Sequence, residues 1–71
     1  MKEYWEKIRE LREDRDLKQA EIAAILHTTQ QVYSRYEKGI NEMPIRHLKT
    51  LCQFYGVSAD YILSLDKKER K

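Results

Sequence analysis

Four polar side chains between positions 30 and 35 have the chemistry to read nucleic-acid bases. Their spacing places them on one face of a helix: Gln30, Gln31, Ser34 and Arg35. A glutamine amide can bond N6 and N7 of adenine together, and an arginine guanidinium can bond O6 and N7 of guanine. We interpret the four residues as a base-reading set. The alternatives are solvated glutamines, and an Arg35 that holds a phosphate or is a plain surface charge.

Two short helices between residues 19 and 39 must position this face. The first has apolar residues at helical spacing, namely Ile22, Ala23, Ile25 and Leu26. The sequence His27-Thr28-Thr29 breaks that pattern and offers hydroxyl groups for the next helix N-cap. The second helix ends at Gly39, a residue type that tolerates the left-handed conformation. Two helices joined by a short turn form a helix-turn-helix, whose second helix lies in the DNA major groove.

The remaining chain predicts further helices and no strand, because it has no alternating β-branched run. The expected helices cover about residues 2–14, 18–26, 29–38, 44–55 and 58–65, and residues 66–71 are expected to fray. Pro44 suits the first turn of the fourth helix, and Ser58 suits the N-cap of the fifth. We therefore expect an all-α fold, a compact five-helix bundle that forms a single domain over residues 1–71. Its fourth helix should bury Leu48, Leu51, Cys52 and either Phe54 or Tyr55.

The composition limits the function classes without choosing one. The chain has 71 residues, a formal net charge of +2 and one cysteine. This length suits one domain with a small core, and a single cysteine excludes an internal disulfide. There is no run of about 18 apolar residues and no apolar signal-peptide core, so we expect a cytoplasmic protein without a membrane span. The modest charge is a weak electrostatic footprint for a nucleic-acid binder.

Enzyme chemistry has little support in the sequence. His27 and His47 are twenty residues apart, and no cysteine or carboxylate pair has metal-ligand spacing. Glycine-rich phosphate loops are absent. Cys52 falls on the apolar stripe of the fourth helix, which indicates an inert core thiol. We predict no catalytic residue, no metal and no cofactor.

The motif residues and their neighbours resemble the phage-repressor-like (Xre/Cro) helix-turn-helix family. The resemblance is carried by Ile8-x-x-Leu11-Arg12, Leu17-x-Gln19-x-x-Ile22-Ala23, Gln30, Ser34-Arg35-Tyr36-Glu37-x-Gly39, and later by Pro44, Leu48, Leu51 and residues 57–63. It covers about residues 4–65 and implies a five-helix domain that binds operator DNA as a symmetric dimer. Two positions depart from the family pattern: Lys18 replaces a capping Ser or Thr, and His27 replaces a turn Gly that has positive φ.

The resemblance also implies roles for individual residues. Gln19 matches a family position that contacts a phosphate, and Thr28 and Thr29 are expected to cap the second helix of the motif or to reach a phosphate. Further candidate phosphate contacts are Lys38, Asn41, Arg46 and Lys49. Arg12 and Glu37 are expected to form a structural ion pair, the alternative being a weak exposed pair worth about 0–1 kcal/mol. Tyr33 and Tyr36 are interpreted as core aromatics, whereas Val32 either touches a thymine methyl or fills space.

Two functions remain open. The first is a sequence-specific DNA-binding transcriptional regulator, a repressor that binds a palindromic operator on double-stranded DNA as a homodimer. Its dimer surface would be the fifth helix, with Tyr61, Leu63 and Leu65. The second is a protein-interaction module, such as the antitoxin of a toxin–antitoxin pair or an anti-repressor. The modest net charge favours the second function, and the polar face of Gln30, Gln31, Ser34 and Arg35 opposes it.

Overall fold

The computed structural model describes residues 3–63, which form five α-helices and no strand. The helices are α1 (Tyr4–Asp14), α2 (Gln19–Ile25), α3 (Gln30–Glu37), α4 (Ile45–Tyr55) and α5 (Ala59–Leu63). The predicted all-α fold is therefore confirmed. The expected ranges of α2 and α3 were one residue too long at each end, and that of α4 was one residue too long at its start, because they included cap residues. The expected starts and ends at Lys2 and Leu65, and the tail 66–71, lie outside the described residues.

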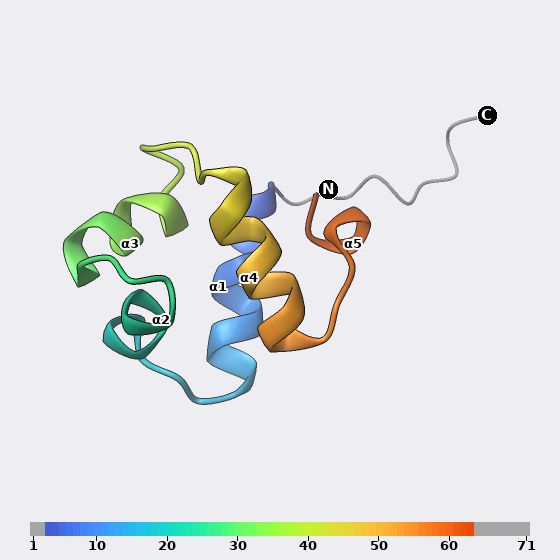
Figure 1. Ribbon diagram of the computed structural model, residues 1–71, viewed down its shortest axis with the longest axis horizontal. Coiled ribbons are helices and arrows are strands. Elements are labelled where there is room, and N and C mark those ends of the chain that lie inside the picture. Colours follow the sequence, from blue (N-terminus) through green and yellow to red (C-terminus); the bar gives the residue numbers. More distant parts are fainter. Residues whose placement is uncertain (1–2, 64–71) are drawn as a thin grey trace.

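The helices surround a small core to which each of them contributes. In Figure 1, α2 and α3 lie to one side of α1 and α4, and α5 lies to the other. Helix α1 contacts both α3 and α5, α2 packs on α3, and α4 packs on α5. The fully buried side chains at the centre are Ile8, Ile22, Tyr33, Leu51 and Ile62. At the end of α4 the core takes Tyr55, whereas Phe54 is 43% exposed. No helix in the described part of the chain is long and apolar enough to cross a membrane.

Three consecutive helices end in the same backbone motif, with a left-handed residue directly after the cap. These residues are Asp16 (φ 56°) after α1, His27 (φ 59°) after α2 and Gly39 (φ 76°) after α3. In the turn after α2, the His27 N–H donates to the Ala24 carbonyl at 3.1 Å and the Thr28 N–H donates to the Ala23 carbonyl at 2.9 Å. This is the Schellman arrangement, which satisfies the last carbonyls of a helix. His27 therefore adopts the conformation that its place in the turn predicted.

Position 39 requires glycine for a steric reason as well as a conformational one. A Cβ atom at this position would lie 2.6 Å from Cε2 of Trp5, far inside van der Waals contact. The indole of α1 thus covers the backbone at the end of α3. A side chain at position 39 would have to displace this ring and also adopt a left-handed backbone that favours glycine.

The helix starts show how the departure at Lys18 is accommodated and where the other predicted cap residues lie. The Lys18 side chain makes no cap hydrogen bond, but its backbone N–H donates to the Glu21 carboxylate at 2.7 Å. We expected Pro44 in the first turn of α4. In the structure it is instead the N-cap residue, directly before that turn. Ser58 accepts a hydrogen bond from the Tyr61 N–H at 3.0 Å, as expected of the cap of α5.

Candidate nucleic-acid interface

The exposed face of α3 forms a polar groove together with the start of α2. The groove is lined by Gln19, Gln30, Gln31, Ser34, Arg35 and Lys38. These are the four predicted base-reading residues and two of the predicted phosphate contacts. No carboxylate lines the groove within residues 3–63. Its surface therefore offers hydrogen-bond donors and positive charge without a group that would repel a phosphate backbone.

The opposite face of α3 is buried, and this determines which face is presented to solvent. Tyr33, Tyr36 and Glu37 are the buried residues of the helix. The two tyrosine rings meet edge to face with centroids 6.4 Å apart, so both are core aromatics as predicted. Val32 is half-buried and packs against the core, which favours its space-filling interpretation. Rotation of α3 about its axis would expose these aromatic side chains, so the polar face is held outward.

Glu37 is the centre of a buried charge network. Its carboxylate accepts two hydrogen bonds from the Arg12 guanidinium, from Nε at 2.7 Å and from Nη2 at 3.0 Å. The Gln19 amide donates a third bond to Glu37 at 3.0 Å, and Arg12 also donates to the Leu17 carbonyl at 2.9 Å. The Glu37 side chain is only 2% exposed, and that of Arg12 is 12% exposed. The pair is therefore a buried bidentate ion pair that joins α1, α2 and α3.

The network keeps Glu37 charged. Burial by itself would raise the pKa of this carboxyl group, but the hydrogen bonds from Arg12, the nearby Tyr33 hydroxyl and the bond from Gln19 outweigh it, so the pKa lies below its usual value. The Tyr33 hydroxyl is buried and has no partner in hydrogen-bond geometry among the described residues. Burial, followed by the proximity of Glu37, raises its pKa strongly. Tyr33 therefore stays neutral beside a permanent carboxylate.

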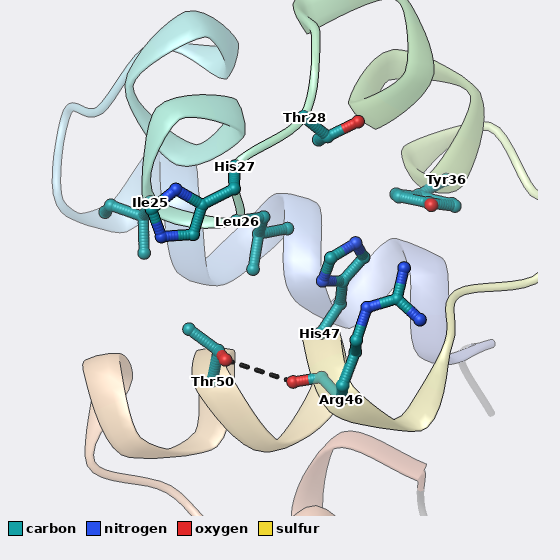
Figure 2. Close-up of a pocket in the computed structure, with 8 residues that line it drawn as sticks. All are labelled: Ile25, Leu26, His27, Thr28, Tyr36, Arg46, His47 and Thr50. Carbon is teal, nitrogen blue, oxygen red and sulfur yellow. Dashed lines mark hydrogen bonds between the residues drawn. The ribbon is translucent and has the colours of Figure 1, made fainter.

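A second groove lies between the turn of the motif and the start of α4 (Figure 2). Thr28 lines it from the turn and Arg46 lines it from α4, so two more predicted phosphate contacts share one site. The Thr29 hydroxyl accepts a hydrogen bond from the Val32 N–H at 3.1 Å and caps α3. Asn41 and Lys49 are exposed and line neither groove. The structure thus gathers most of the predicted contacts into two grooves, and Thr29, Asn41 and Lys49 lie outside both.

A profile of the helix-turn-helix family matches residues 8–62, a range that includes both grooves and the buried ion pair. This chain belongs to the Xre-type helix-turn-helix family. The transcriptional repressor RstR of the cryptic phage CTXphi from Vibrio cholerae is 38% identical to it over 58 residues. That match covers 82% of this chain and 52% of the repressor, so the chain spans about half the length of this relative.

The second groove of this Xre-type domain also contains residues that sequence reasoning missed. His47 is buried, and its ring lies edge to face against that of Tyr36 with centroids 5.9 Å apart. His27 lines the same groove from the turn. The spacing of the two histidines in the sequence bears only on metal binding, and no group of three or more metal-ligating side chains occurs within residues 3–63. The available signal was that both histidines flank predicted phosphate contacts: His27 precedes Thr28, and His47 follows Arg46.

Proposed function

We propose that this chain is a sequence-specific DNA-binding transcriptional regulator, a cytoplasmic repressor that places α3 in the major groove of operator DNA. The observation that carries the proposal is the polar groove on α3 and α2. All of its lining side chains are amides, a hydroxyl or cations. Such side chains match the edges of bases and the phosphates beside them. The family membership and the similarity to a phage repressor support the same conclusion.

The proposal assigns the residues to two roles. Gln30, Gln31, Ser34 and Arg35 read base edges, because α3 presents them together on its exposed face. The phosphate contacts are Gln19, Thr28, Thr29, Lys38, Asn41 and Arg46. Arg12 and Glu37 hold the helices in place and do not touch DNA, since the carboxylate is almost fully covered.

A homodimer that reads a palindromic operator is part of the proposal. Tyr61 on α5 is 41% exposed, and Leu63 lines an apolar groove with residues of α1 and α4. Ile45, in the same groove, is 81% exposed. A symmetric dimer would cover these apolar side chains and place the two α3 helices in half-sites about one helical turn apart. Leu65, the third expected dimer contact, lies outside the described residues.

Selection from a randomised DNA library at two salt concentrations tests the proposal. We expect the bound fraction to contain a palindrome with half-sites separated by about 10 base pairs. Affinity should fall steeply as the salt concentration rises, because phosphate contacts release counterions. Recovery of random sequences at both salt concentrations would contradict sequence-specific binding.

A protein-interaction module is the second candidate, and the exposed apolar groove with Ile45 favours it. An antitoxin or anti-repressor would use this groove for a different protein. The library experiment separates the two candidates. A protein-interaction module would enrich no DNA sequence from the library. Substitution of Ile45 by a polar residue would then weaken the complex with the partner protein, and the library would still yield no enriched sequence.

A further inference from the structure

The second groove has the composition of an anion site, and two histidines are part of it. Figure 2 shows His27 and Thr28 on the side of the motif turn and Arg46 and His47 on α4; the His27 ring lies beside Ile25, whereas the His47 ring and the Arg46 guanidinium point toward Thr28 and Tyr36. The Tyr36 ring lies beside His47, and Thr50 lies one turn further along α4, where its hydroxyl donates to the Arg46 carbonyl at 3.0 Å. No carboxylate lines this groove within the described part of the chain.

The electrostatics around His47 disfavour its protonated form in the free protein. Burial lowers the pKa of this imidazole, and the charges of Arg46 on α4 and His27 after α2 lower it further. From α3 the neighbouring titratable group is the phenol of Tyr36. None of these groups stabilises an imidazolium, so His47 is held neutral near pH 7 with cationic neighbours and no counter-ion.

The location of the groove connects it to DNA. Thr28 directly precedes Thr29, the N-cap of α3, and the first residues of α3 are those that meet base edges in a helix-turn-helix. Arg46 and His47 lie in the first turn of the eleven-residue helix α4, where the helix dipole favours an anion over a cation. The groove is thus a continuation of the proposed DNA face, on the side where a phosphate would flank the recognition helix.

We propose that this groove holds a DNA phosphate, and that His47 takes up a proton from solvent when the phosphate is bound. The inference rests on the proposed function and adds a regulatory property to it. The phosphate oxygens accept hydrogen bonds from the Thr28 hydroxyl, the Arg46 guanidinium and the His47 imidazole N–H. The negative charge supplies the counter-ion that the groove lacks, so the imidazolium form of His47 becomes favourable.

The direction of the pH dependence follows from this coupling. DNA binding raises the affinity of the His47 imidazole for protons, and by reciprocity protons raise the affinity for DNA. The DNA affinity therefore increases as the pH falls, by up to about tenfold per pH unit for each proton taken up. The contribution of Arg46 is independent of pH in this range, because its guanidinium stays charged.

The chain contains only two histidines, which makes a direct test possible. The imidazole resonances are titrated by NMR in the free protein and in complex with a mixed-sequence duplex of about 20 base pairs at low salt, which spans two half-sites. We expect the pKa of His47 to rise on DNA binding, because the phosphate stabilises its imidazolium form. In parallel, the affinity for the same duplex is measured at about pH 6 and about pH 8, on either side of the ordinary histidine pKa.

The variants separate protonation from folding. His27→Gly supplies the residue that suits the left-handed backbone at this position, so its fold is secure. His47→Gln keeps a polar side chain of similar reach, and its fold is checked by circular dichroism. We expect the affinity of the wild type for the duplex to rise at least about tenfold from about pH 8 to about pH 6. Uptake of about one proton over part of this range would give such an increase. His47→Gln should lose this rise, and His27→Gly is the matched control, which should keep it.

The failure of the inference differs from the failure of the proposed function. If the duplex binds but the His47 pKa does not move, or His47→Gln keeps the wild-type pH dependence, the proton coupling is overturned while DNA binding stands. If the wild-type protein binds no duplex at either pH, the proposed function fails together with the inference.

Discussion

Gln19 and Glu37 are joined by a hydrogen bond of 3.0 Å, from the side-chain amide to the carboxylate. Gln19 is the first residue of α2, and Glu37 is the last residue of α3. The two ends of the helix-turn-helix are therefore tied to each other, and through Glu37 to Arg12 of α1. The tie has a consequence for mutagenesis, because removal of Gln19 affects the position of both helices as well as any phosphate contact.

The ion pair should be the most sensitive polar element of the fold. Glu37→Ala removes the carboxylate that accepts two bonds from Arg12 and leaves this cation the Leu17 carbonyl and the exposed Glu13 carboxylate at 3.9 Å. Arg12→Ala leaves the buried Glu37 carboxylate without its cation. We expect either variant to lower the free energy of unfolding by about 3–5 kcal/mol. Urea denaturation measures this change. The double variant Arg12→Met with Glu37→Leu should be more stable than either single variant, since no unpaired charge remains. Equal stability of the single variants and the wild type would show that the pair is solvated.

The left-handed residue in the turn gives a stabilising substitution. His27→Gly should raise the free energy of unfolding by about 1 kcal/mol, because a residue with a Cβ is strained at positive φ and glycine is not. Thermal unfolding is measured at about pH 8, well above the ordinary histidine pKa, to separate this backbone effect from charge. Asp16→Gly is the matched control, since Asp16 has the same backbone conformation in the same motif. A lower melting temperature for both variants would contradict the strain argument.

The two glycines should respond differently to alanine. At Gly56 a Cβ would meet nothing within 4 Å, so Gly56→Ala carries only the cost of positive φ, about 1 kcal/mol. At Gly39 the added Cβ also collides with Trp5. We expect Gly39→Ala to lower the free energy of unfolding by clearly more than Gly56→Ala does. Chemical denaturation of the two variants side by side measures the difference, and similar values would mean that the indole moves aside without cost.

Stability should depend on pH through His47. Because burial lowers its pKa in the folded chain, the unfolded chain binds a proton at higher pH than the folded chain does. The stabilisation is fully present above the unfolded pKa of about 6.5 and is lost as the pH falls through that value toward the folded pKa. Denaturant unfolding between about pH 8 and pH 5 should show this loss in the wild type, around the ordinary histidine pKa. His47→Gln should have a flatter profile, and an unchanged profile would assign the loss to other groups.

The base-reading assignment predicts different outcomes for two residues of one groove. Gln30→Ala should cost about 1–3 kcal/mol on the selected operator and relax preference at one base pair. Lys38→Ala should weaken binding to all sequences similarly and reduce the salt slope by about 1. Lys38 serves this comparison better than Gln19, whose amide is bonded to Glu37. If the ratio of specific to random binding is unchanged in Gln30→Ala, the residue does not read bases.

The local patterns in the sequence predicted the helices and the polar face of α3. That face could be predicted from the sequence because Tyr33 and Tyr36, three residues apart, define the buried side of the same helix. The burial of His47 could not be predicted from the sequence, since it depends on the Tyr36 ring of another helix. The hydrogen bond from Gln19 to Glu37 joins residues eighteen positions apart and likewise depends on tertiary packing. The sequence periodicity could not decide whether Phe54 or Tyr55 enters the core, because the two are adjacent. The rotation of α4 in the folded chain buries Tyr55.

Trp5 is the only tryptophan of the chain, and its ring covers Gly39 at the end of α3. Its indole emission is therefore an intrinsic optical reporter of whether the recognition helix is anchored to the first helix. Because the groove side chains lie on the exposed face of α3, DNA can occupy them without contacting this ring. A change in emission on DNA binding would thus record a movement of the helix itself, without any label.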